Sequence, residues 1–204
     1  MKGGWLVGVV GVVVLAYITL NSLRTEGLDP TGLERGAELP PFAMPLATSA
    51  SEGAANIATR PGSATEGKVP ACTVRGPEIL NVCELSERGP LVLAFVVTRA
   101  KDCQRQVDVL DEVAARVPGV GFAAVAVRDD RDRLRRLIGE RGWRVPVGYD
   151  RDGAVGNLYG LGLVCPLLTF AGRDGRVAKS ELGFVDAPAL EAAAQALAAD
   201  RPVP

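Results

Sequence analysis

The sequence has no histidine among its 204 residues. This absence excludes Ser–His and Cys–His catalysis and leaves cysteine thiolates and carboxylates as the only candidate metal ligands. We predict neither a metal site nor a cofactor. The 23 Lys and Arg residues nearly balance the 24 Asp and Glu residues, for a formal net charge of −1. Since no Lys/Arg-rich run is present, we expect no nucleic-acid partner.

Cysteine is also scarce, with four residues at Cys72, Cys83, Cys103 and Cys165. An even set of this kind is compatible with disulfide bonds in an oxidising compartment. Four cysteines permit three complete pairings, and the sequence alone does not choose between them.

Charge is missing from one long N-terminal stretch, Gly3 to Leu20. As a helix this stretch is about 27 Å long, close to the roughly 30 Å hydrocarbon core of a bilayer. Trp5 and Tyr17 suit the two membrane interfaces. We predict a transmembrane anchor over residues 1–23. A cleaved signal peptide is the alternative, but no small-x-small cleavage site follows the apolar run.

The remaining chain divides into a linker and one domain. Lys2 precedes the span, which favours a cytoplasmic N-terminus and an extracytoplasmic domain at the cell membrane. Residues 24–38 have the Gly, Pro and mixed charge of a linker, and residues 39–200 form the predicted domain. The prolines of Pro40–Leu46 indicate an edge strand, and residues 48–70 indicate a flexible surface insertion rich in Ala, Ser, Thr and Gly.

From residue 90 the apolar pattern becomes regular. Leu91–Val97 is a continuous apolar run, as expected for a strand buried on both faces. A helix follows, with Val107, Leu110, Val113, Ala114 and Val117 on one face. Val120–Val127 predicts a second buried strand. Arg128–Gly142 predicts a helix whose dense Arg/Asp face we expect to be solvated.

The C-terminal part adds a strand at Val145–Asp150, a helical turn at Ala154–Tyr159 and a hairpin of Leu167–Ala171 with Arg176–Lys179. A final helix runs from Pro188 to Ala199. The order is β-α-β-α-β-(α)-β-β-α, which predicts an α/β domain. Strands linked by helices run parallel and the last two run antiparallel, so the sheet is mixed.

This order, with Cys103 at the first helix and Val164-Cys165-Pro166 before the hairpin, resembles the thioredoxin-like superfamily. Within it, the chain is most similar to membrane-anchored extracytoplasmic redoxins. The resemblance covers residues 39–199. It implies a three-layer thioredoxin-like fold with a mixed central sheet, and a cis proline at Pro166 facing the active-site cysteines. It also implies an oxidoreductase whose partners are extracytoplasmic protein thiols or disulfides.

The chain departs from the resemblance at the redox motif. Family members carry Cys-x-x-Cys, whereas this chain reads Ala100-Lys101-Asp102-Cys103, so dithiol exchange within one loop is impossible. The family geometry places Cys165 near the first turn of the Cys103 helix, which makes it a candidate partner. The alternative is that Cys165 is simply a small buried apolar residue. Lys101 favours a Cys103 thiolate and Asp102 opposes it.

Cys72 and Cys83 bracket a short segment that contains Gly76 and Pro77. A disulfide closing this loop stabilises a fold by roughly 2–3 kcal/mol in the chain-entropy model. We predict a structural disulfide here, with a second redox pair as the alternative.

Three functions are compatible with these features. The first is a membrane-tethered thiol-disulfide oxidoreductase that acts through Cys103, with Cys165 resolving. The second is a redox-inactive thioredoxin-fold module that binds a partner. The third is a peroxidase of the peroxiredoxin kind. That family places Thr three residues before the cysteine and Pro four before that, where this chain has Ala100 and Val96.

Overall fold

The computed structural model describes residues 11, 12, 14, 32–51, 53–55 and 69–204. All but three residues of the predicted anchor at 1–23, most of the predicted linker and most of the predicted insertion lie outside the described residues. Among the helices of the described residues, none is long and apolar enough to cross a membrane.

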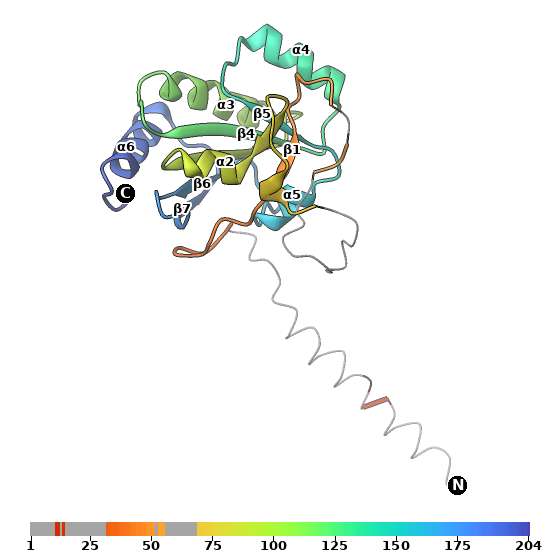
Figure 1. Cartoon of the computed structure of the whole chain (residues 1–204), viewed down its shortest axis with the longest axis horizontal. Coiled ribbons are helices and arrows are strands. Elements are labelled where there is room, and N and C mark those ends of the chain that lie inside the picture. Colours follow the sequence, from red (N-terminus) through yellow and green to blue (C-terminus); the bar gives the residue numbers. More distant parts are fainter. Residues whose placement is uncertain (1–10, 13, 15–31, 52, 56–68) are drawn as a thin grey trace.

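A five-stranded sheet forms the centre of the domain (Figure 1). Its strands, in spatial order, are β5 (Val147–Asp150), β4 (Gly121–Val127), β3 (Leu91–Val96), β6 (Leu167–Ala171) and β7 (Val177–Leu182). The pairs β3–β4 and β4–β5 are parallel, and β3–β6 and β6–β7 are antiparallel. The predicted mixed sheet and the predicted order of elements are therefore confirmed.

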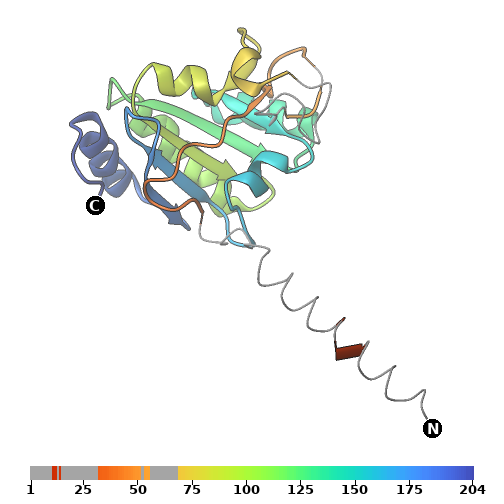
Figure 2. The same ribbon diagram turned by 60° about the horizontal axis from the view of Figure 1, so that its bottom comes forward.

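Helices cover both faces of the sheet and make three layers (Figures 1 and 2). On one face lie α3 (Lys101–Ala114), α4 (Arg131–Arg141) and α6 (Ala187–Ala198), and on the other lie α2 (Val82–Glu87) and α5 (Ala154–Leu158). Side chains of β3 alternate between these layers because successive residues of a strand point to opposite faces. Val92, Ala94 and Val96 belong to the first core, and Leu91, Leu93 and Phe95 to the second.

A second, two-stranded sheet covers part of the α2 face. It pairs β1 (Ala43–Pro45) antiparallel with β2 (Ile79–Asn81), next to the 3-10 turn η1 (Ala71–Thr73). The strand predicted at Pro40–Leu46 is thus present, but η1, β2 and α2 have no counterpart in the sequence analysis. Two of these, η1 and β2, have three residues each and are too short to display a hydrophobic period.

The described part of the predicted linker belongs to the fold. Gly36 N–H donates to Val177 O (2.7 Å) and Val177 N–H donates to Ala37 O (2.8 Å), so this segment adds to the edge of β7. Gly32 is buried, and a Cβ placed there would lie 2.9 Å from Leu167 Cδ1. The folded domain therefore begins before residue 39.

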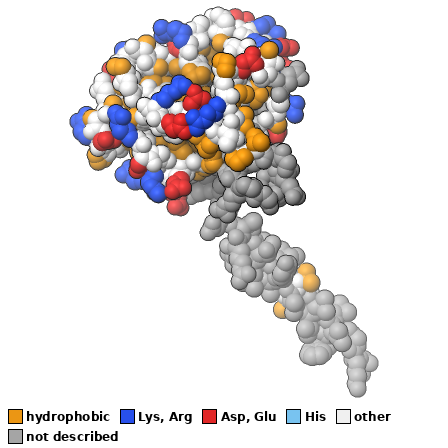
Figure 3. Space-filling view, viewed as in Figure 1, with side chains coloured by type: hydrophobic (Ala, Val, Ile, Leu, Met, Phe, Trp, Pro, Cys, Tyr) orange, Lys and Arg blue, Asp and Glu red, His pale blue; other side chains and the backbone are white. Residues whose placement is uncertain are grey.

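The prediction of a solvated charged face on α4 is wrong for part of that face. Arg131 and Arg135 each donate to the backbone carbonyls that follow β1, at 3.1 Å to Leu46 O and 2.9 Å to Ala47 O respectively. Both guanidinium groups also reach Ser49 O, at 2.7 and 2.5 Å. On the face seen in Figure 3, Lys and Arg side chains are interspersed with Asp and Glu side chains.

Candidate functional site

Cys103 and Cys165 are joined in a disulfide although they lie 62 residues apart in the sequence. Their Cα atoms are 5.9 Å apart, within the range that a disulfide spans. Cys103 is the third residue of α3 and its side chain is 1% exposed. Cys165 immediately precedes Pro166, and the peptide bond between them is cis, as the resemblance implies. The structure thus brings together the two cysteines named as the candidate redox pair.

Cys165 has a different environment from Cys103. It is only partly buried, and its Sγ accepts a hydrogen bond from Val97 N–H at 3.1 Å. The two residues before it, Leu163 and Val164, are 106% and 50% exposed. Cys165 is therefore less buried than Cys103 and directly follows two exposed apolar side chains.

The turn that connects β3 to α3 holds Val97 in place. Ala100 N–H donates to Val97 O (3.0 Å), which closes the turn, and Gln104 Nε2 donates to Thr98 O (2.6 Å). Thr98 is fully buried, and its hydroxyl donates to the Asp129 carboxylate. The Arg133 guanidinium donates to Thr98 Oγ1 (2.9 Å) and to the same carboxylate.

Sequence reasoning missed Thr98, Asp129 and Arg133 as supports of this turn. Their positions in the sequence could have indicated the contact between Thr98 and Asp129. Each residue follows one of two adjacent parallel strands, and the carboxyl ends of these strands meet at one edge of the sheet. The sequence predicts Arg133 on the solvated face of α4, and this prediction is wrong because the Arg133 guanidinium reaches back to Thr98 and Asp129 at this edge.

Ala100 occupies the position at which the family motif carries its first cysteine, and it is the N-cap of α3. Ala100, Lys101 and Asp102 are all exposed, so the first turn of the helix meets solvent on the side away from Cys103. Pro166 is buried, and its carbonyl accepts from Gly183 N–H at 2.8 Å.

No protein family and no curated protein matches the sequence. Solved structures do match. One, assigned as a thiol:disulfide interchange protein DsbE from Chlorobium tepidum, is 17% identical, with a TM-score of 0.58 over 77% of this chain and 91% of that one. A secreted disulfide oxidoreductase of Mycobacterium tuberculosis homologous to DsbE is 22% identical, with a TM-score of 0.54 over 59% and 90%. A DsbF homologue from Corynebacterium diphtheriae is 16% identical, with a TM-score of 0.58 over 78% and 87%.

The chain has the thioredoxin-like fold. This confirms the fold that the resemblance implies. In the thioredoxin-like domain, the carboxyl end of β3, the start of α3 and the segment before β6 meet where the Cys103–Cys165 disulfide lies.

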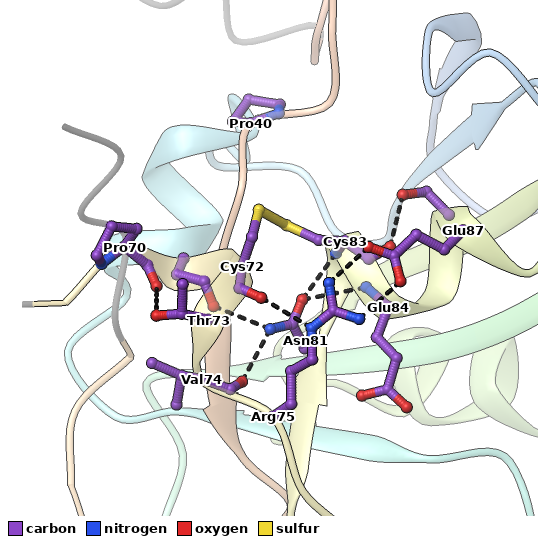
Figure 4. The surroundings of a disulfide bond; sticks show 12 residues. Pro40, Pro70, Cys72, Thr73, Val74, Arg75, Asn81, Cys83, Glu84 and Glu87 are labelled. Carbon is purple, nitrogen blue, oxygen red and sulfur yellow. Dashed lines mark hydrogen bonds and ion pairs between the residues drawn. A yellow bond between two sulfur atoms is a disulfide. The ribbon is translucent and has the colours of Figure 1, made fainter.

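The second disulfide joins Cys72 in η1 to Cys83 in α2, with Cα atoms 5.4 Å apart (Figure 4). Asn81, 2% exposed, lies beside it as the N-cap of α2, and its Oδ1 accepts from Cys83 N–H (2.8 Å). Its Nδ2 donates to Ala71 O (2.9 Å) and Val74 O (2.8 Å). The Asn81 side chain thus binds the segment around η1 as well as the first turn of α2. This disulfide and Asn81 together fasten η1 to α2.

A buried carboxylate, Asp150, lies at the end of β5. Its Oδ2 accepts from Gly156 N–H (2.8 Å) and so holds the start of α5. Among the described residues, no donor reaches Asp150 Oδ1. Desolvation is the main reason why the pKa of this carboxyl is raised. The side chain positions α5, from which the chain continues toward Cys165.

Proposed function

We propose that this chain is a membrane-tethered, extracytoplasmic thiol-disulfide exchange protein whose redox pair is Cys103 and Cys165. One observation carries the proposal: a disulfide joins the start of α3 to the residue before cis-Pro166, in a domain that lacks the family's first cysteine. The family dithiol is thus replaced by a pair from two distant segments.

The chemistry balances as a two-electron exchange. A client thiolate attacks one sulfur of the Cys103–Cys165 disulfide, and the other sulfur leaves as a thiolate. The client's second thiolate then attacks the mixed disulfide. The client leaves oxidised, and the domain keeps both electrons and, after protonation, two thiols. The reverse sequence reduces a client disulfide.

The surroundings of the pair support this chemistry. The free N–H groups and dipole at the start of α3 stabilise a thiolate on Cys103. The Val97 N–H does the same for Cys165. The similar solved structures named as an interchange protein and a disulfide oxidoreductase add support for protein thiols or disulfides as clients.

The proposed membrane tether is the uncharged stretch from Gly3 to Leu20. The start of the folded domain lies near the redox pair, because Gly32 packs against Leu167, two residues after Cys165. The chain between a span ending at residue 23 and Gly32 reaches at most about 30 Å. A membrane anchor would therefore hold the redox pair close to the bilayer surface.

Redox titration of the full-length chain in detergent tests the exchange function. At each ratio of reduced to oxidised dithiothreitol, the thiols are alkylated and the disulfides mapped by mass spectrometry. We expect Cys103–Cys165 to open and re-form reversibly, and insulin reduction to be lost in Cys103→Ser and in Cys165→Ser. Wild-type insulin reduction that equals either variant would overturn the proposal.

The location is tested separately in intact cells. A membrane-impermeant maleimide, applied after mild reduction, should label Cys165 without cell lysis, and the chain should stay in the membrane fraction after carbonate washing. Labelling only after lysis would place the domain in the cytoplasm and contradict the topology.

Ala100 favours a second candidate, a binding module without redox turnover, because a single cysteine at the helix start has no partner within its loop. This candidate predicts background insulin reduction in all forms of the chain.

No specific observation favours a peroxidase: Ala100 has no hydroxyl, and the Cys103 sulfur is buried and disulfide-bonded.

A further inference from the structure

The two sulfurs of the candidate redox pair are unequal in access. The Cys103 side chain is 1% exposed and lies beneath the first turn of α3. Cys165 is partly buried and follows Leu163 and Val164, two of the large apolar side chains that are exposed to solvent. Cys165 is therefore the more accessible cysteine of the pair, whereas Cys103 is part of the buried core.

We infer, given the proposed exchange function, that Cys165 is the sulfur that bonds to the client and that Cys103 is the resolving cysteine. This reverses the order expected from the sequence, where Cys103 attacks and Cys165 resolves. The difference arises because Cys103 matches the second position of the missing motif, while the exposed first position is Ala100.

The leaving group supports the same order. When a client thiolate attacks Cys165, the bond to Cys103 breaks and the electron pair stays on Cys103 Sγ. That sulfur is in the first turn of a 14-residue helix, where a thiolate is stabilised. Attack on the accessible sulfur thus leaves the electron pair on the sulfur at the start of the helix.

The reverse reaction needs a thiolate on Cys165. Its Sγ accepts the Val97 N–H hydrogen bond at 3.1 Å, and a hydrogen bond to the charged form favours that form. The Val97 turn is itself held by Thr98, its buried partner Asp129 and the partly exposed Arg133. The Cys165 thiolate attacks a client disulfide, a client thiolate leaves, and the Cys103 thiolate then attacks Cys165 Sγ to release the client.

Single-cysteine variants of the full-length chain test this assignment. Cys103→Ser leaves Cys165 as the one thiol of the pair, and Cys165→Ser leaves Cys103, with Cys72–Cys83 intact in both. Each variant is incubated with insulin and with glutathione disulfide, and the mixed disulfides are counted by mass spectrometry. Retention of the Cys72–Cys83 bond and the circular dichroism spectrum serve as folding controls.

We expect Cys103→Ser to form mixed disulfides at least about tenfold faster than Cys165→Ser, because thiolate access controls the rate. Equal rates, or faster capture by Cys165→Ser, would overturn the inference while the exchange function stands. Capture by neither variant, together with an inactive wild-type chain, would defeat the exchange function and this inference with it.

A measurement on the wild-type chain avoids the risk that a variant misfolds. The reduced chain is mixed with glutathione disulfide and quenched with acid within milliseconds to seconds, and the glutathionylated peptide is identified. We expect the adduct on Cys165. An adduct on Cys103 would refute the assignment without any substitution.

Discussion

Thr98 and Asp129 hydrogen-bond to each other from the ends of two adjacent parallel strands. Thr98 follows β3 in the turn before α3, and Asp129 follows β4, and both side chains are buried. Arg133 donates to both, which completes a network that fastens the turn. This turn carries the Val97 N–H that reaches Cys165 Sγ, so a polar network away from the sulfurs positions one of them.

Thr98→Val should loosen this turn. The substitution leaves one carboxylate oxygen and one guanidinium N–H without their partner, which costs about 1–3 kcal/mol of unfolding free energy. We also expect slower alkylation of Cys165 in the reduced chain, because a less fixed Val97 N–H stabilises the Cys165 thiolate less. Denaturant unfolding and timed iodoacetamide labelling measure the two effects.

Thr73→Val is the matched control, since the Thr73 hydroxyl also donates one hydrogen bond, to the backbone carbonyl of Pro70 (2.7 Å), but at an exposed position. It should leave Cys165 alkylation unchanged. Unaltered stability and labelling in Thr98→Val would show that the network does not hold the turn.

Introducing a cysteine at position 100 should produce the Cys-x-x-Cys dithiol that this chain lacks. In a Cys165→Ser background, Ala100→Cys places a thiol three residues before Cys103 at the first turn of α3, where side chains three apart are neighbours. We expect a disulfide between positions 100 and 103 and recovery of insulin reduction. Disulfide mapping and the insulin assay check this, with Cys165→Ser alone as control. A double variant that stays reduced under air would rule out the family geometry at this turn.

The long helices and strands and the position of the redox pair could be predicted from the sequence. The residues that hold the turn beside the pair, Thr98, Asp129 and Arg133, could not. Leu91–Val96 is apolar throughout, so a strand buried on both faces was readable from composition alone. The proximity of Cys103 and Cys165 came from the resemblance, because no local pattern links residues 62 apart. The solvated position predicted for Arg133 is wrong because an arginine on an amphipathic helix has the same sequence pattern whether it is solvated or binds a buried carboxylate.

Loss of the Cys72–Cys83 disulfide should reduce stability and leave exchange intact. Replacing both cysteines with Ser opens an 11-residue separation, and the chain-entropy model gives a loss of roughly 2–3 kcal/mol. Asn81 keeps its bonds to η1 and α2, so the local structure should persist. Thermal unfolding and the insulin assay are the measurements. Loss of exchange in a variant that remains folded would instead indicate a second redox pair at Cys72–Cys83.

The buried Asp150 should make stability pH-dependent. Desolvation raises its pKa in the folded state, so the protonated form is favoured on folding. Its contribution to stability is full below the unfolded pKa of about 3.9 and is lost as pH rises through the raised folded value. Asp150→Asn does not titrate. We therefore expect the variant to gain stability relative to wild type between pH 4 and pH 7, measured by denaturant unfolding. A constant difference across this range would contradict the desolvation argument.

Leu163→Ser should separate client recognition from sulfur chemistry. The side chain is 106% exposed two residues before Cys165, so removing it should change stability by less than about 0.5 kcal/mol. If a protein client covers this leucine during exchange, the lost burial of about 1.5–3 kcal/mol lowers kcat/KM for that client roughly 10- to 150-fold. Glutathione disulfide is too small to cover it, and its rate should stay the same in both proteins. Equal losses with insulin and glutathione disulfide would mean that Leu163 acts on the redox pair itself, and no loss with either would mean that clients approach Cys165 from another side.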